Sequence, residues 1–443
     1  MEPLTVDLSQ LSTPHYKGSV QNLYHRDDQT MICETTASGS VFDVGSIFQI
    51  AGSDLSRAAF RHYIYTTLHT PEAWHSVAQQ LEEDFGERRK FLAFINPPAT
   101  EGHNLLQRFQ QQGAPTHHLG MIDRQSGQVY AQGFPPQVSP FVLVEKFTVI
   151  RPLPVNYRFS HFWDYSPYKN QADHVVPLEN IVRLGLTSGS SIYQKFLHLD
   201  ETQRRKFLKE MGVEELPLWR FFPVPIADFT SKYEPEDRAL SYQEALHISG
   251  LNGDHFLDLI RMTLLGTLLV RGVFREMGLT LWDIKWELAK KNNQLLFVDT
   301  IDTDSLRVTC TVQDEDQEMF VHFNKQAIRD YYKIMTSDWF EAVKIAKAEA
   351  AQHGVTFHEI LEQGQKSGKF PATPEIDSRF LQIQEQKFAI LLNYVLDRVQ
   401  PGDSVAARLE RAEEVRAIAR QEVQFYQQAG AIHSFLALNS LRR

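Results

Sequence analysis

The stretch "PLENIVRLGLTSGSS", residues 177–191, joins a short apolar run with one arginine to a turn of small residues. The run predicts a strand, and alternate side chains of a strand face the same side, so Glu179 and Arg183 share one face. Ser190 and Ser191, beside a glycine, can add N–H and hydroxyl donors next to the planar fork of the arginine. The stretch therefore predicts an anion site, and a carboxylate is the anion that we expect. The alternative is a surface ion pair between Arg183 and Glu179, whose four-residue spacing gives poor geometry on a strand.

Length and composition narrow the possible function classes. The chain has 443 residues, which predicts two to three domains or one large two-lobed domain. Hydrophobic residues make up 42% and charged residues 23%, an ordinary globular composition with enough apolar material for a core. The formal net charge is -10, which argues against a nucleic-acid binder because such proteins need a basic surface against phosphates.

The cysteines and the N-terminal residues point to a reducing compartment. Cys33 and Cys310 are far apart, and no CxxC motif is present, so neither a disulfide framework nor a zinc module is indicated. The N-terminal "MEPLTVDLSQ" lacks the apolar core of a signal peptide, and no apolar run is long enough to span a bilayer. We expect a soluble, cytoplasmic protein that acts on small molecules rather than on nucleic acid or membrane. Association with further copies of the chain stays open.

Strand patterns concentrate in the first 310 residues and helical patterns follow, which predicts an α+β fold. Three regions are expected: a β-rich nucleotide-binding lobe with a helical insertion, a central α+β lobe with the substrate and metal site, and a helical region packed on it. Their boundaries are 1–150, 151–310 and 311–443. Within them we expect strands or hairpins at 30–36, 141–155, 174–186 and 280–302. Helices are expected at 52–69, with Ser53 as its N-cap, at 253–277 and near the C-terminus.

A second candidate site lies in "LWDIKWELA" and the following "LLFVDTIDTDSLR". Asp283, Lys285 and Glu287 alternate, so one strand face carries acid, base, acid. Asp299 ends the next strand, and two carboxylates across a hairpin can share Mg²⁺, which prefers oxygen ligands and substrate phosphates. Lys285 could then meet a phosphoryl group. The alternative is a solvated strand face with alternating charges.

A third, weaker candidate is the turn "YKGSVQNLY", residues 16–24, in which Lys17 and Gly18 are bracketed by aromatic residues. Such a turn between strands can cover a nucleotide. On its own the pattern fits a plain hairpin as well.

The order of these motifs resembles that of the SAICAR synthetases (phosphoribosylaminoimidazole-succinocarboxamide synthetases) of purine biosynthesis. The family motifs "YxGKxxxxY", "SAFD", "IPLEVVVRxxxTGSS", "FTPxTKxExxDxxISxxEA", "GIxLxDxKxEFG", "IDExxTPDSSR" and "DKQxxRDY" occur in the same order. The matching segments here are "YKGSVQNLY" (16–24), "SVFD" (40–43), "VPLENIVRLGLTSGSS" (176–191), "IADFTSKYEPEDRALSYQEA" (226–245), "GLTLWDIKWELA" (278–289), "VDTIDTDSLR" (298–307) and "NKQAIRDYY" (324–332).

The resemblance implies a two-lobed, ATP-grasp-like or kinase-like fold with the nucleotide site between the lobes and a helical C-terminal extension. It also implies that Mg-ATP phosphorylates a carboxylate and that the amine of aspartate then displaces phosphate to form an amide. The implied site residues fall into four groups. These are catalytic Lys285 and Asp283; nucleotide-binding Lys17, Gly18, Glu179, Lys285 and Glu287; magnesium-binding Glu287 and Asp299; and substrate-binding Arg183, Ser190, Ser191, Asp304, Ser305 and Arg307.

Several departures from the family motifs fall where phosphates would bind. Ser19 and Gln21 stand where the family turn has lysines, "ASGS" (37–40) replaces "DRIS", and Thr300 replaces an acid. We therefore expect a diverged ligase that acts on another carboxylated acceptor in specialised metabolism. The alternatives are a genuine purine-biosynthesis SAICAR synthetase and a non-catalytic nucleotide-binding paralogue. Whether Arg57, Arg61 or Lys146 replaces the missing lysines in space stays open.

Overall fold

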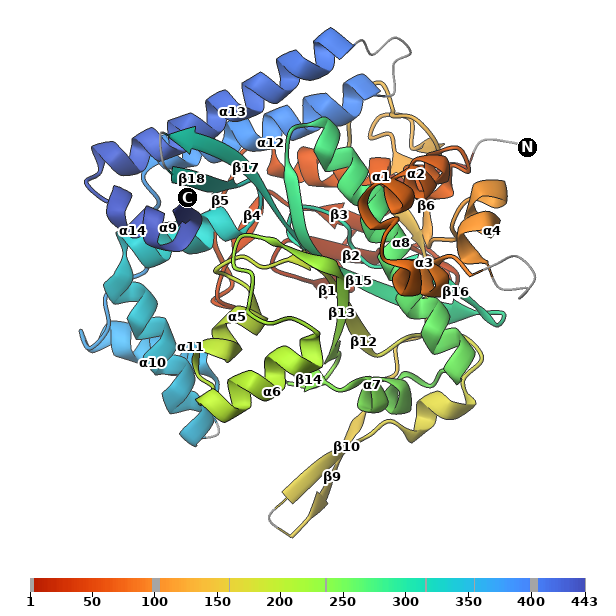
Figure 1. Ribbon diagram of the computed structural model, residues 1–443, viewed down its shortest axis with the longest axis horizontal. Coiled ribbons are helices and arrows are strands. Elements are labelled where there is room, and N and C mark those ends of the chain that lie inside the picture. Colours follow the sequence, from red (N-terminus) through yellow and green to blue (C-terminus); the bar gives the residue numbers. More distant parts are fainter. Residues whose placement is uncertain are drawn as a thin grey trace.

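The computed structural model describes residues 4–97, 104–158, 160–235, 237–314, 317–353, 355–398 and 405–442. Helices and strands are mixed along the chain, which confirms the predicted α+β class (Figure 1). The helices are α1 (Ser53–His69), α2 (Ala73–Phe85), α3 (Arg89–Ile95), α4 (Leu105–Gln112), α5 (Ser191–Leu197), α6 (Glu201–Met211), α7 (Tyr242–Ser249), α8 (Gly253–Glu276), α9 (Gln326–Met335), α10 (Ser337–His353), α11 (Phe357–Lys366), α12 (Ser378–Arg398), α13 (Val405–Gln428) and α14 (Ile432–Asn439).

Two large sheets hold most of the strands. The strands are β1 (Tyr16–Lys17), β2 (Gln21–His25), β3 (Thr30–Thr35), β4 (Ser38–Ser40), β5 (Ser46–Gln49), β6 (His118–Ile122), β7 (Val129–Tyr130), β8 (Phe141–Glu145), β9 (Leu153–Tyr157), β10 (Ser160–Asp164), β11 (His174–Val175), β12 (Leu178–Gly185), β13 (Phe221–Ser231), β14 (Ala239–Leu240), β15 (Thr280–Lys291), β16 (Gln294–Val298), β17 (Leu306–Asp314), β18 (Gln317–His322) and β19 (Ser440–Arg442).

The first sheet is antiparallel, with strand order β1-β2-β3-β8-β6-β7. Its central strand β3 buries Ile32 and Cys33, because both faces of the sheet are covered. Helix α1 packs on one of these faces through Ile64 and Leu68, whose four-residue spacing places them on one side of the helix. The same helix contacts α12 on its other side. Helix α1 therefore stands between the first sheet and the C-terminal helices.

The second sheet is built around the long strand β15. Its order is β14-β13-β12-β15-β17-β18-β19, and β11 and β16 pair with the far half of β15. The register places Ile181 opposite Lys285 and Arg183 opposite Asp283. This pairing brings the two segments that carry the candidate site residues side by side. Helix α8, with an apolar surface buried along most of its length, covers one face of the sheet (Figure 1).

The C-terminal helices α12 and α13 run side by side along one edge of the molecule, where α13 packs on β17 and α12 packs on α1 (Figure 1). The apolar positions of α13, Val415 and Val423, are buried in this packing, so the amphipathic helix packs against its own chain. Strand β19 then adds to the edge of β18. The boundary expected at residue 310 falls inside β17, so the central sheet continues into the C-terminal region. The division into three regions remains a prediction.

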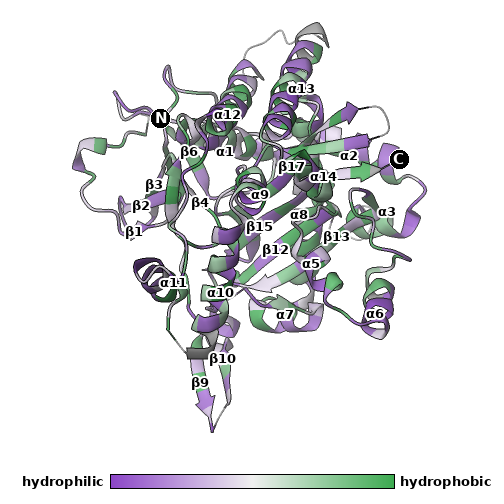
Figure 2. Cartoon of the chain, turned by 90° about the vertical axis from the view of Figure 1, so that its left-hand side faces the viewer, coloured by the Kyte–Doolittle hydropathy of each residue, from purple (hydrophilic) through white to green (hydrophobic). Residues whose placement is uncertain are grey.

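Two local predictions need correction. The strand expected at 141–155 is divided into β8 and β9, because the chain between them, which ends in Pro152, leaves the first sheet and lines a cleft. The helix expected at 52–69 begins with Ser53 as its first residue, and Gly52 in a left-handed conformation occupies the cap position. Strands β9 and β10 form a hairpin that projects from the body of the molecule (Figure 2). In the described part of the chain, no helix is long and apolar enough to cross a membrane.

Candidate active site

A cleft with a cavity volume of about 180 Å³ lies between the two sheets. Strands β2, β3 and β8 supply one wall, and β15, β16 and the segment after β16 supply the other. The lining combines apolar and ionisable side chains, as expected for a site that holds an aromatic ring next to phosphates. The lining residues are Gln21, Leu23, Met31, Cys33, Arg61, His117, Val144, Glu145, Lys146, Phe147, Val149, Val175, Lys232, Tyr233, Glu287, Val298, Asp299 and Thr300.

Lys285 stands next to this cleft between two carboxylates. Its Nζ lies 2.6 Å from Oε1 of Glu179 on β12 and 3.0 Å from Oε1 of Glu287 on its own strand. Burial alone would lower the pKa of Lys285, but Glu287, Glu179 and Asp299 outweigh it and raise the pKa above its ordinary value. Lys285 is therefore held as a cation. The alternative interpretation, a solvated strand face with alternating charges, is excluded because Glu287 is only 3% exposed.

Glu287 and Asp299 lie side by side at the floor of the cleft. Burial and the charge of Asp299 raise the pKa of Glu287, whereas Lys232 and Lys285 outweigh burial and lower the pKa of Asp299. Lys232 is the residue that follows strand β13, and its ammonium forms an ion pair with the carboxylate of Glu287. Asp299 has a left-handed backbone (φ 65°), and Tyr65 donates a hydrogen bond to its carbonyl. The strained turn thus aims the carboxylate at Glu287.

Two adjacent carboxylates are hard oxygen donors that suit Mg²⁺ together with substrate phosphates. Among the described residues, no group of three or more His, Cys, Asp or Glu side chains could hold a metal ion. The pair of Glu287 and Asp299 therefore fits a magnesium ion that takes its remaining ligands from a nucleotide and water. It does not fit an ion enclosed by protein ligands alone.

Arg183 is at the centre of a second cluster, and its side chain is almost completely buried. Its Nη1 and Nη2 donate to the hydroxyls of Ser190 (3.1 Å) and Ser191 (3.3 Å). Asp228 binds its Nε, and the carboxylate of Asp283 lies 3.5 Å from Nη1. The predicted proximity of the arginine to the serine turn is confirmed. The surface pair with Glu179 is excluded, because Glu179 instead binds Lys285 and accepts from Thr230.

Arg307 on β17 extends this cluster. It donates to Asp283 (2.8 Å) and to the carbonyl of Gly189 in the serine turn (2.9 Å), and its Nε finds no hydrogen-bond partner in the described part of the chain. A side chain at Gly189 would collide with the amide of Gln326 on α9, about 2.6 Å from an added Cβ. Close contact between the turn and α9 therefore requires glycine here. Two arginines and two hydroxyls converge, which makes an anion site chemically sound.

The loop 299–307 separates the cleft from a further cavity through two ion pairs with α1. Arg61 lies 3.3 Å from Asp302, and Arg57 lies 2.9 Å from Asp304. Ser305 turns inward and donates to the carbonyl of Asp302. Of the three acceptor-site residues predicted in this loop, Arg307 reaches the arginine cluster, Asp304 faces α1, and Ser305 braces the loop itself.

Two predicted nucleotide contacts are less direct. Lys17 ends β1 and Gly18 begins the β1–β2 turn, and neither lines the cleft. Gln21, three residues after Gly18, lines it and accepts a hydrogen bond from Thr300. Three cleft cations were absent from the predicted nucleotide site: Arg61, Lys146 and Lys232. Lys232 lies in "FTSKYEPED", one of the recognised motifs, so the sequence carried a signal for it. For Arg61 and Lys146 the sequence indicated only a possible replacement of the missing lysines, because nothing in their local sequence places them at the cleft.

The comparisons with known proteins agree with the motif order. A family model described as SAICAR synthetase matches residues 157–346. A putative phosphoribosylaminoimidazole-succinocarboxamide synthase from Archaeoglobus fulgidus is 27% identical over 248 residues, which cover 55% of this chain and 67% of the relative. Phosphoribosylaminoimidazole-succinocarboxamide synthase from Thermoplasma acidophilum is 24% identical over 225 residues, which cover 50% of this chain and 64% of the relative.

Solved structures with a similar arrangement include a SAICAR synthase (TM-score 0.48, 14% identity), which covers 89% of this chain and 98% of that chain. The Saccharomyces cerevisiae SAICAR synthase complexed with SAICAR has a TM-score of 0.46 and 16% identity over 89% of this chain and 98% of its own. A type-2 SAICAR synthetase in complex with ADP has a TM-score of 0.40 and 15% identity over 71% of this chain and 89% of its own. The matching family model, the two curated relatives and the seven motifs in family order make this chain similar to the SAICAR synthetases.

Proposed function

We propose that the chain is an ATP-dependent ligase that joins a carboxylated acceptor to the amine of aspartate or a similar amino acid. One phosphoryl group passes from ATP to a carboxylate oxygen and leaves ADP. The amine then attacks the acyl carbon, phosphate departs, the nitrogen loses a proton, and an amide remains. The observation that carries the proposal is the cluster of Lys285, Glu179, Glu287 and Asp299 beside a cleft between two sheets.

The residues of the cleft suit the binding of a nucleotide. Leu23, Met31 and Val144 offer an apolar wall for a base, and Lys232 and Arg61 face the carboxylate end of the same cleft. Glu287 and Asp299 would hold Mg²⁺, which would offset the charge on the phosphates. Lys285 and Lys232 would keep that carboxylate pair oriented and present positive charge to the transferring group without reorganisation.

The arginine cluster suits the carboxylates of an amino acid. Arg183 keeps its fork between Ser190 and Ser191, and Asp228 and Asp283 neutralise it while no anion is bound. An incoming carboxylate would take over hydrogen bonds that the serines and aspartates now occupy. Asp283 would act as a positioning residue, because it touches both Arg183 and Arg307.

The names of the two curated relatives favour a second candidate, a genuine SAICAR synthetase of purine biosynthesis. The matched part spans about two thirds of those relatives, and the lysines of the family turn are replaced here by Ser19 and Gln21. These replacements favour a different acceptor, because a phosphorylated ribotide and ATP both need cations at their phosphates.

ADP release tests the two candidates together. The full chain is mixed with Mg-ATP, aspartate and carboxyaminoimidazole ribotide, and the products are identified by mass spectrometry. Formation of the succinocarboxamide at ordinary enzyme rates would establish the purine enzyme. ADP release with a product only from another carboxylate would establish the diverged ligase. ADP binding without turnover across a panel of carboxylates would contradict both and leave a non-catalytic paralogue.

A further inference from the structure

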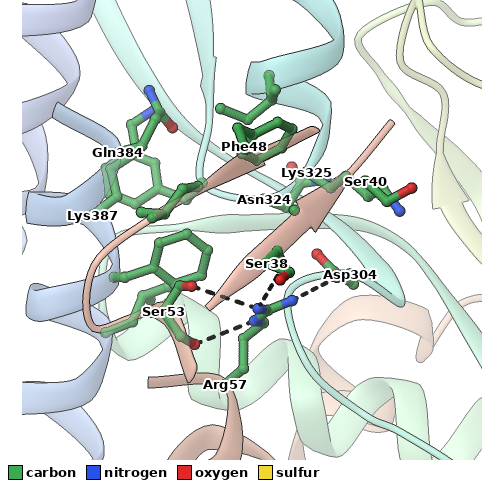
Figure 3. Close-up of a pocket in the computed structure, with 16 residues that line it drawn as sticks. Ser38, Ser40, Phe48, Ser53, Arg57, Asp304, Asn324, Lys325, Gln384 and Lys387 are labelled. Carbon is green, nitrogen blue, oxygen red and sulfur yellow. Dashed lines mark hydrogen bonds and ion pairs between the residues drawn. The ribbon is translucent and has the colours of Figure 1, made fainter. Parts of the chain in front are cut away.

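Helix α1 holds the loop 299–307 at three successive points. Arg57, Arg61 and Tyr65 lie one helical turn apart, so their side chains leave the same face of the helix. Each of them meets one residue of the loop, and the pairs are Arg57 with Asp304, Arg61 with Asp302, and Tyr65 with Asp299. The first pair lies at the wall of the further, second cavity beyond the loop (Figure 3). The pairs follow the helix and the loop in opposite order, so α1 fixes the loop from residue 299 to residue 304.

The contact of Tyr65 differs from the two ion pairs because it reaches the main chain. The hydroxyl lies 2.8 Å from the carbonyl oxygen of Asp299 and 2.9 Å from that of Val298, the last residue of β16. Tyr65 is completely buried, and its ring stacks on the imidazole of His118 from β6, with 5.3 Å between the ring centroids. The ring is therefore fixed between the first sheet and the end of β16, and its hydroxyl is aimed at the loop.

Asp299 has a backbone that needs support. Its φ of 65° lies in the left-handed region, which residues other than glycine rarely adopt. In this conformation its carboxylate accepts a hydrogen bond from the main-chain N–H of Thr300 and lies within hydrogen-bond reach of the carboxyl group of Glu287. Since the direction of a side chain follows the backbone dihedral angles, a relaxed, extended Asp299 would turn its carboxylate away from Glu287.

Tyr65 cannot act on a ligand directly, because it lines neither the cleft nor the second cavity. His117, which also forms a hydrogen bond with the backbone of Asp299, does line the cleft. Any effect of Tyr65 on ligand binding must therefore pass through the conformation of Asp299.

The metal pair is sensitive to such a change. Mg²⁺ demands near-octahedral geometry with short bonds to oxygen, so it loses affinity when a ligand rotates. Among the described residues, Glu287 and Asp299 belong to no larger group of potential metal ligands, so a misplaced Asp299 leaves one protein carboxylate. Hydrogen bonds that orient a ligating residue typically change metal affinity about ten- to hundredfold.

We propose that Tyr65 is a positioning residue for magnesium: its hydroxyl keeps Asp299 in the left-handed conformation that places the carboxylate beside Glu287. The inference rests on the proposed function, because it takes Glu287 and Asp299 as the magnesium ligands. It does not depend on which carboxylate and amine the ligase joins. Loss of the hydroxyl should weaken metal binding and leave the contacts between the nucleotide and the cleft unchanged.

Tyr65→Phe removes the hydroxyl and keeps the ring that stacks on His118. Electron paramagnetic resonance with Mn²⁺ in place of Mg²⁺ measures the metal bound to the full chain in the presence of ADP. We expect Tyr65→Phe to bind Mn²⁺ about tenfold more weakly than the unaltered chain. Isothermal titration of ADP in excess EDTA measures the nucleotide alone, and this dissociation constant should stay within about twofold.

Two further variants make the test specific. Tyr394→Phe is the matched control, since Tyr394 is also completely buried and its hydroxyl lies 2.9 Å from Glu276 at the end of α8. Tyr394 lines neither cavity, so both measurements should equal those of the unaltered chain. Asp299→Asn tests the metal pair itself and should remove most of the Mn²⁺ binding.

The outcomes separate this inference from the proposed function. If Asp299→Asn loses Mn²⁺ and Tyr65→Phe binds it as Tyr394→Phe does, the positioning role is wrong and the magnesium pair stands. If Asp299→Asn binds Mn²⁺ normally, or if ADP does not bind at all, the inference and the proposed nucleotide site are both wrong. If Tyr65→Phe weakens metal-free ADP as strongly as it weakens Mn²⁺, Tyr65 supports the whole cleft and its specific role in metal binding is refuted.

Discussion

The two cavities beside α1 differ in chemistry although the same helix and loop wall both. In the nucleotide cleft, Lys232, Lys285, Glu287 and Asp299 form a buried network of opposite charges. In the further cavity beyond the loop 299–307, which Phe48, Phe323 and Phe388 help to line, Lys325 is the one cation for which the described residues show no ion pair or hydrogen bond. The difference matters for ligand binding, because a network of charged groups suits phosphates and an apolar wall does not.

Two arginines of α1 show the same contrast between the cavities within a single helical turn. Arg57 and Arg61 lie four residues apart, are both at most 3% exposed, and each pairs with an aspartate of the loop 299–307. Arg57 has its donors satisfied, while Nε of Arg61 has no hydrogen-bond partner among the described residues. A buried donor without a partner is costly, so a bound phosphate would relieve Arg61 and not Arg57.

The largest effect should come from the charged network. Lys285→Ala should lower kcat on the order of 10²-fold or more, because a preorganised charge at the reacting centre is lost. The measurement is steady-state ADP release with saturating Mg-ATP. Lys344→Ala, at an exposed site on α10, is the matched control. Unchanged kcat in Lys285→Ala would remove Lys285 from the chemistry and leave it a structural ion-pair partner.

The arginine cluster should come next. Arg183→Lys keeps the charge but loses the fork that now spans Ser190 and Ser191. We expect the KM for the amino acid to rise about thirtyfold, in line with one or two charge-assisted hydrogen bonds. The KM for ATP should stay within about twofold, since the cluster lies outside the lining of the cleft. A rise confined to the ATP KM would reassign Arg183 to the nucleotide.

The comparison within α1 predicts a smaller but more selective effect. Arg61→Lys should weaken ADP binding about tenfold by isothermal titration, because lysine cannot both reach Asp302 and offer a second donor to a phosphate. Arg57→Lys, with equal burial and an aspartate partner in the same loop, should leave ADP affinity unchanged. Equal loss of ADP affinity in both variants would mean that α1 acts only as a support, and the proposed replacement of the missing lysines by Arg61 would fall.

The sequence predicted the charged region better than the apolar one, for a physical reason. Alternation along a strand and pairing across a hairpin are short-range rules, so Asp283, Lys285, Glu287 and Asp299 could be placed from spacing alone. Arg57 and Arg61 meet the loop 299–307 across more than 240 residues, and no local pattern encodes that contact. The second cavity needs β5, α9 and α12 together, and the separation between Phe48 and Phe388 in sequence hides it entirely.

The smallest expected effect tests whether the position of helix α1, rather than its two arginines, causes the difference between the two cavities. His62 on α1 lies away from both cavities and meets His118 (2.7 Å) and the carbonyl of Gly133. Burial lowers its pKa from 6.5 to about 4. At pH values between the two pKa values, His62 binds a proton in the unfolded chain but not in the folded chain. The contribution of His62 to the free energy of unfolding is therefore complete above about pH 6.5 and is lost as the pH falls towards about 4.

Between about pH 7.5 and about pH 5.5, this residue should lower the free energy of unfolding by about 1 kcal/mol. Urea unfolding at the two pH values measures it, and His62→Gln should show a pH dependence smaller by that amount. ADP affinity at the higher pH should be the same in both proteins, because His62 lines neither cavity. If His62→Gln weakened ADP as much as Arg61→Lys, the position of α1 and not the guanidinium would govern the cleft, and the two arginines would no longer explain why the cavities differ.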